Sequence, residues 1–109
     1  MFTIDYYSPV VKQEIDELPK GFKARYIVLT ARIVLEGANL GMPHTRSMGD
    51  GLFELRLKSV EGIARVMYCT LVGQQVVMLH SFIKKTEKTP KRDLELAIQR
   101  MKEVKNVKH

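Results

Sequence analysis

Arg56, Lys58 and Arg65 are side chains whose types and spacing fit chemistry on a phosphate group. Arg56 and Lys58 lie two residues apart in an alternating segment, so both point from the same face of a predicted strand. Arg65 follows across a short turn, and a hairpin would bring it close to Arg56, where we expect it to be exposed over the site. Lys84 and Lys85 end a later apolar segment and can approach from the far side. Converging cations can bind a phosphate and stabilise the extra charge of its transition state.

The same spacing also fits an ordinary exposed sheet, because strands carry Arg and Lys for solubility and for protection of their edges. Glu54 shares the face of Arg56 and can serve as a base, although a cross-strand ion pair is the commoner role for a carboxylate there. Tyr68 follows Arg65 by three residues and is expected to face the core. Spacing alone leaves both interpretations of the basic residues open.

His80 is the candidate proton carrier, because imidazole gains and loses a proton near neutral pH. It lies in an apolar segment, where a histidine is more often a hydrogen-bonded core residue. Strict alternation would put it on the face of Val76 and Met78, and we expect burial. His44 lies in a segment whose composition is typical of a flexible loop, so it does not indicate a fixed site.

The remaining residue types exclude several kinds of site. The acidic side chains are scattered, which argues against a two-metal nuclease centre, and no metal or cofactor is predicted. Cys69 is the only cysteine, so an intramolecular disulfide is excluded, and its apolar surroundings predict a buried structural thiol.

The elements that must position these residues follow from the apolar periodicity. Residues 1–7 form a predicted strand, and Ser8-Pro9 begins a short helix that ends near residue 18. A longer helix runs from Phe22 to about Gly37, and residues 37–51 are predicted to be a loop. Three strands follow at 52–58, 63–72 and 75–83, before a last helix that Thr89-Pro90 introduces.

This order of β-α-α-β-β-β-α predicts a single α+β domain over residues 1–109. We expect an antiparallel sheet with two N-terminal helices packed on it and a C-terminal helix. The net charge is +6, and residues 84–109 carry nine basic and four acidic side chains. A concentrated positive field favours a polyanionic partner, although a solvated basic helix explains it equally well. No segment is typical of a signal peptide or a membrane span, so the cytoplasm is the expected location.

Three segments carry a resemblance to a known family: GLFELRLKS (51–59), GIARVMY (62–68) and VVMLHSFIKKTEKTP (76–90). They resemble the HigB group of RelE-type toxins, in particular its phage-protein-like branch. The resemblance implies a RelE-like fold and a metal-independent endoribonuclease that cuts mRNA, usually on the ribosome. It also implies neutralisation by an antitoxin with a helix-turn-helix fold.

The resemblance assigns roles to three cations, because the family carries basic residues at the positions of Arg56, Arg65 and Lys85. Lys58, Lys84 and Lys88 are then expected to bind the RNA backbone. Two departures leave the general acid and base unassigned. Glu54 stands where relatives carry a lysine, and no tyrosine follows Phe82.

Three functions are compatible with these observations. The first is a toxin that cleaves mRNA with the RNA's own 2′-hydroxyl as nucleophile. Arg56 and Arg65 would stabilise the phosphate, Lys85 the leaving oxygen, and His80 would carry a proton. The alternatives are a ParE-like toxin that binds DNA gyrase without cutting RNA, and a basic RNA-binding module with no catalytic activity.

Overall fold

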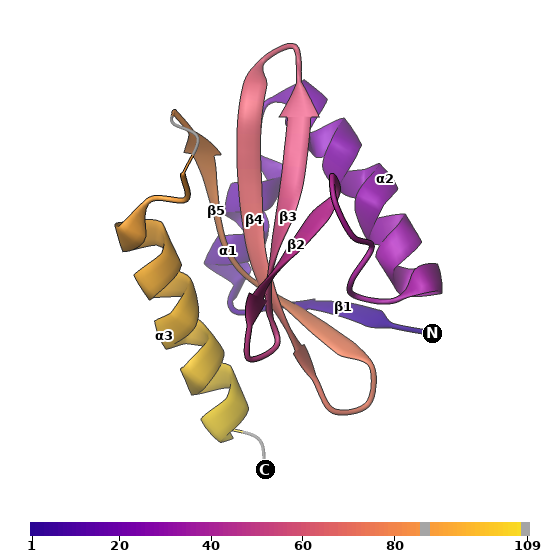
Figure 1. Ribbon diagram of the computed structural model, residues 1–109, viewed down its shortest axis with the longest axis vertical. Helices are drawn as coiled ribbons and strands as arrows, with labels where there is room; N and C mark the ends of the chain where they lie inside the picture. The colour runs from indigo at the N-terminus through magenta and orange to yellow at the C-terminus, as the bar shows by residue number, and fades with distance from the viewer. Residues whose placement is uncertain (86–87, 108–109) are drawn as a thin grey trace.

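The structure, a computed structural model, describes residues 1–85 and 88–107 (Figure 1). Its elements follow the predicted order, with one additional strand. The bounds are β1 Thr3–Tyr6, α1 Pro9–Asp16, α2 Lys20–Glu36, β2 Thr45–Gly49, β3 Leu52–Ser59, β4 Gly62–Leu71, β5 Gln75–Lys84 and α3 Lys91–Val107.

The strands form one five-stranded sheet in the order β1-β5-β4-β3-β2. β3 pairs antiparallel with β4, and β4 with β5, as the predicted meander requires. The additional strand, β2, pairs antiparallel with β3. β1 pairs with β5 in parallel, so the sheet is antiparallel except at this edge. A parallel pair needs a long crossover, and here the crossover is the rest of the chain between β1 and β5.

Helices cover the sheet on both faces (Figure 1). The predicted α+β class, with two N-terminal helices on the sheet and a C-terminal helix, is confirmed. One core lies between the sheet and α1 and α2, and includes Ile15, Phe22 and Leu29. The other lies between the sheet and α3, and includes Met67 and Ala97. Across the part of the chain that the structure describes, no helix is long and apolar enough to cross a membrane.

The first helix begins where the sequence predicts. The side chain of Ser8 accepts a hydrogen bond from the backbone N–H of Val11 at 3.2 Å, and Pro9 occupies the first helical turn. Such a cap satisfies one of the backbone donors that have no partner inside the helix. Val11 and Ile15, one turn apart, are buried against the sheet.

The predicted loop over residues 37–51 is wrong for residues 45–49, which form β2. β2 pairs with β3, with Thr45 opposite Leu55 and Ser47 opposite Phe53. Gly and polar residues dominate this segment, so its sequence has the composition of a loop. The strand forms because its backbone completes the edge of β3, which the amino-acid pattern of the segment does not show.

Candidate active site

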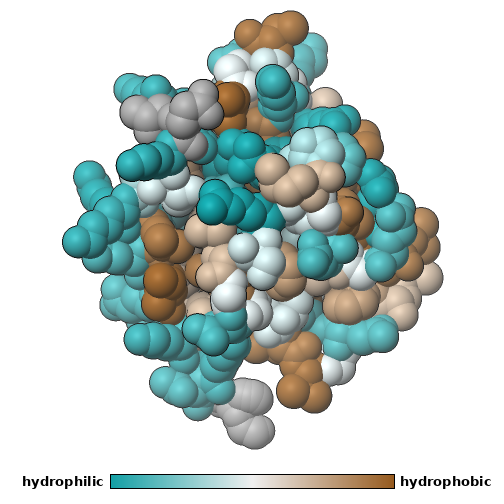
Figure 2. Space-filling model, in the orientation of Figure 1, coloured by the Kyte–Doolittle hydropathy of each residue, from teal (hydrophilic) through white to brown (hydrophobic). Residues whose placement is uncertain are grey.

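Arg56 and Arg65 lie directly opposite each other across the hairpin of β3 and β4, as predicted. The next pair in the register is Lys58 with Ile63, on the same face of the sheet. α3 contacts this face nearer the other end of the strands, through residues such as Leu52 and Cys69 in its core. Figure 2 shows strongly hydrophilic side chains gathered over β3 and β4, between α3 and α2. The register thus concentrates cations on the part of this face that α3 leaves open.

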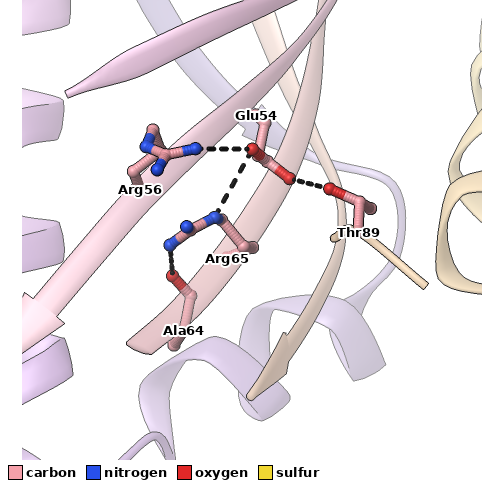
Figure 3. Close-up of polar contacts among 5 residues, drawn as sticks. All are labelled: Glu54, Arg56, Ala64, Arg65 and Thr89. Carbon is pink, nitrogen blue, oxygen red and sulfur yellow. Dashed lines mark hydrogen bonds and ion pairs between the residues drawn. The ribbon is translucent and has the colours of Figure 1, made fainter. Parts of the chain in front are cut away.

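Glu54 contacts both arginines, as Figure 3 shows. Its side chain is completely buried, and its Oε1 lies 3.3 Å from Nη1 of Arg56 and 3.4 Å from Nε of Arg65. Thr89 donates a hydrogen bond from its hydroxyl to Oε2 at 2.5 Å. The cross-strand ion pair predicted for Glu54 is therefore present. A buried carboxylate needs such partners, and in return it fixes the orientation of both guanidinium groups.

Arg65 is more buried than predicted. We expected it to be exposed above the site, but only 3% of its surface is accessible. Its Nη1 donates to the backbone carbonyl of Ala64 at 3.1 Å, and its Nε faces Glu54. Arg56, by contrast, keeps 27% of its side chain exposed. Arg65 therefore contributes its charge from the floor of the site, and Arg56 from the rim.

A pocket of about 300 Å³ opens over this pair. It brings together residues from α2, the segment before β2, and the hairpin of β3 and β4. Its lining consists of Arg25, Pro43, His44, Arg56, Lys58, Ile63 and Arg65. Four of these carry a permanent positive charge, and none of the lining residues that the structure describes is acidic. Such a pocket attracts phosphate groups and stabilises added negative charge.

Arg25 and His44 are the ionisable lining residues that the sequence did not predict. Arg25 lies on α2, 31 positions before Arg56, and its spacing marks it only as a polar position between buried residues. His44 lies in the segment predicted to be a flexible loop. The only available signal was composition, and composition does not report which residues pack together.

Backbone and side-chain bonds fix the segment that carries His44. Its N–H donates to the carbonyl of Gly41 at 3.0 Å, and its carbonyl accepts from the N–H of Arg56 at 2.8 Å. The buried hydroxyl of Thr45 accepts from the N–H of Gly41 at 2.8 Å. Earlier in the same segment, the carbonyl of Ala38 accepts a hydrogen bond from the hydroxyl of Tyr68 at 2.5 Å. These bonds hold His44 in place, although the composition of its segment is typical of a flexible loop.

His80 lies elsewhere on the sheet, because the register shifts between β4 and β5. Met67 pairs with His80, and Tyr68 pairs with Met78, so Leu79 is an additional residue in β5. Such a bulge reverses the alternation beyond it. His80 therefore faces α3 together with Leu79, and not the core that contains Met78, which corrects the predicted face.

His80 binds to the beginning of α3. Its Nε2 lies 2.7 Å from a carboxylate oxygen of Asp93, and its ring stacks on Phe82 with the centroids 5.6 Å apart. The side chain is 14% exposed, so His80 is partly buried and not fully buried as expected. Among the residues described around the pocket, His80 is not part of the lining.

This pair predicts a structural effect of His80→Gln. The change should lower the melting temperature by several degrees, because a charge-assisted hydrogen bond that holds α3 to the sheet is lost. Thermal unfolding followed by circular dichroism measures the effect. Asp93→Asn should produce a similar decrease, and the double variant should add little to either. A melting temperature equal to that of the wild type in both single variants would contradict this role.

The predicted lysines cluster where β5 ends. Lys84 pairs with Ile63 across the sheet, so Lys58, Ile63 and Lys84 form a row over three strands. Lys85 follows immediately and is exposed, as is Lys88. Lys85 is not among the described lining residues of the pocket, but the strand end that carries it lies beside one of them.

Burial changes the pKa of the Cys69 thiol. Removal from water raises the pKa of its thiol to about 11, because the charged thiolate loses solvation there. The predicted buried structural thiol is confirmed. In residues 1–85 and 88–107, no group of three or more His, Cys, Asp or Glu side chains is placed to hold a metal ion.

The site is a basic pocket on the part of the sheet face that α3 leaves open, and a buried carboxylate positions its two arginines. A small α+β protein with such a pocket is suited to binding polyanions. Comparison with known proteins gives the family. Residues 13–102 match the family of the phage derived protein Gp49-like (DUF891), and the chain belongs to this family.

The chain is also similar to two curated proteins from Mycobacterium tuberculosis, both named "Probable endoribonuclease HigB1". The one from strain CDC 1551 / Oshkosh is 34% identical over 94 residues, which cover 86% of this chain and 73% of the relative. The one from strain ATCC 25618 / H37Rv has the same identity and coverage. The resemblance to the HigB group that the sequence shows is therefore confirmed.

Proposed function

We propose that this protein is the toxin of a toxin–antitoxin pair and acts as an endoribonuclease on mRNA. The observation that carries the proposal is the pairing of Arg56 with Arg65 in a pocket lined by four permanent cations. Phosphodiester cleavage passes through a phosphorus centre with additional negative charge, which such a pocket stabilises. The similarity to proteins named endoribonuclease supports the same activity.

The proposed reaction uses the 2′-hydroxyl of the RNA as nucleophile and requires no metal ion. Arg65 and Arg56 stabilise the phosphate in the transition state, and Lys85 neutralises the leaving oxygen. Lys58, Lys84 and Lys88 bind the backbone on either side of the cleaved bond. This backbone contribution weakens as the salt concentration rises, because each contact releases counterions from the RNA.

The proposed substrate is mRNA on the ribosome, and the proposed partner is an antitoxin with a helix-turn-helix fold. In residues 84–85 and 88–107, basic side chains lie along the end of β5 and along α3. An acidic segment of the antitoxin is attracted to this surface, and electrostatic attraction accelerates its association.

The proposal predicts the chemical ends of the RNA fragments. Attack by the 2′-hydroxyl leaves a 2′,3′-cyclic phosphate upstream and a 5′-hydroxyl downstream. Purified protein is added to a translation extract, the cuts are mapped by primer extension, and the downstream ends are labelled with a kinase without prior phosphatase treatment. We expect labelled fragments at the mapped sites.

Different results would identify the alternatives. Fragments with 3′-hydroxyl and 5′-phosphate ends indicate attack by water, typically with metal assistance, and contradict the proposed chemistry. RNA binding without cuts would support the non-catalytic module, and inhibition of DNA gyrase without cuts would support the ParE-like toxin. The same reaction on ribosome-free RNA decides whether the ribosome is required.

A further inference from the structure

His44 extends the row of Arg56 and Arg65 across the sheet. The hydrogen bond from the N–H of Arg56 to the carbonyl of His44 continues the pairing of β2 with β3 by one residue beyond Thr45. Thr45 pairs with Leu55, so the next pair is His44 with Arg56. Residues paired in this way have their Cβ atoms roughly 5 Å apart, on the same face. His44, Arg56 and Arg65 therefore line one pocket side by side, from the segment just before β2 through β3 to β4.

The backbone of His44 is held in place, whereas its side chain remains accessible. The bonds to Gly41 and Arg56 hold its backbone, and buried Thr45 anchors the next residue. Its side chain is only partly buried, as access to a substrate requires. His80 lacks this access, because its Nε2 is engaged by Asp93 beneath α3.

The charged groups near His44 come from four elements. Those that share its pocket or lie close to it along the chain are Arg25, Arg46, Arg56, Lys58, Arg65 and Glu36. Arg32 lowers the pKa of Glu36 through their ion pair, and the charge of His44 adds to this effect. Within this set, His44 is the side chain of a type that exchanges a proton near neutral pH.

We propose that His44 is the general base of the cleavage reaction, an inference that rests on the proposed function. Neutral imidazole accepts the proton of the 2′-hydroxyl while the 2′-oxygen forms its bond to phosphorus. The bond from phosphorus to the 5′-oxygen breaks, and its electron pair remains on that oxygen. The charge of Lys85 stabilises this oxygen until it takes a proton from water. The proton on His44 then passes to solvent and neutralises the hydroxide left there. No other reactant is needed.

The test measures single-turnover cleavage by His44→Gln from pH 5 to 8. The wild-type rate should rise with pH as imidazole loses its proton, whereas the variant should be about a hundredfold slower at pH 7.5 and should lack this rise. RNA binding should change less than twofold, because the surrounding cations remain. Ser47→Ala, at an exposed position of β2, serves as the matched control and should retain the wild-type profile.

A second variant covers the case in which glutamine disturbs the local fold. His44→Ala should regain part of its lost rate when free imidazole is added, because the added base occupies the vacated space. A purely structural role would not give this rescue. The proposal is overturned if His44→Gln keeps a rate within a few-fold of wild type, or if His80→Gln loses the pH-dependent rise instead.

The two proposals fail in distinguishable ways. If wild-type protein produces no fragments with 5′-hydroxyl ends, the proposed function fails, and the role of His44 fails with it. If wild-type protein produces these fragments and His44→Gln produces them at the same rate, only the role of His44 is overturned.

Discussion

Arg56→Ala should reduce the single-turnover rate of RNA cleavage by about 10²–10³, the usual cost of removing one positioned donor from a charged transition state. Arg56 lines the pocket and keeps part of its guanidinium exposed to a substrate. Glu54 retains Arg65 and Thr89 as partners after the change, so the negative charge of the buried carboxylate is still balanced by an ion pair and a hydrogen bond. We therefore expect the melting temperature to fall by only a few degrees.

Arg56→Lys separates charge from geometry. Lysine restores the positive charge but not the planar fork of a guanidinium, which can contact Glu54 and a phosphate at the same time. Its rate should lie between those of wild type and Arg56→Ala. Arg32→Ala is the matched control, because this arginine also pairs with a carboxylate but is not among the described lining residues. A rate for Arg56→Ala within a few-fold of wild type would show that Arg56 only supports the fold.

The sequence predicted the central hairpin well because two independent patterns agree there. Leu55 and Leu57 alternate with Arg56 and Lys58, and a short turn leads into the next strand. Alternation fixes the face on which each side chain lies, and the turn fixes the register. The juxtaposition of two arginines follows from those two facts alone, and the structure contains it.

The face of His80 could not be predicted in the same way. The segment from Val76 to Phe82 is largely apolar on both faces. A shift of its pairing register by one residue therefore still places apolar side chains against a core on each face. Nothing in the sequence therefore opposes the bulge at Leu79. Without a polar face to mark the solvent side, the register of a strand is weakly determined by its sequence.

The other half of the pocket depends on contacts between distant segments. Arg25 reaches the site from α2, and His44 from the segment just before β2. Local patterns describe which face of a helix is apolar, but they do not say where a polar side chain at the border of that face will point. The burial of Arg65 was missed for a related reason, since it depends on tertiary contacts such as the ion pair with Glu54.

Arg65→Ala should destabilise the protein by about 3 kcal/mol, the low end of the cost of breaking a buried ion pair by removing one partner. Glu54 would remain completely buried and would lose its contact with Arg65, while Arg56 and Thr89 compensate for only part of that loss. The free energy of unfolding is measured from urea denaturation, with the slope checked for two-state behaviour. Loss of cleavage by this variant is therefore informative only after its folded fraction has been measured.

The double variant Arg65→Met, Glu54→Met distinguishes a buried charge from a lost packing contact. Removing both partners leaves no uncompensated carboxylate, and apolar side chains of similar size can fill the space. We expect the double variant to be more stable than Arg65→Ala and close to wild type, while its cleavage stays as low as that of the single variant. Stability and activity then separate, because the ion pair with Glu54 can be replaced by apolar packing but the positive charge beneath the phosphate cannot. A double variant that is less stable than Arg65→Ala would show that the pair itself holds β3 and β4 together.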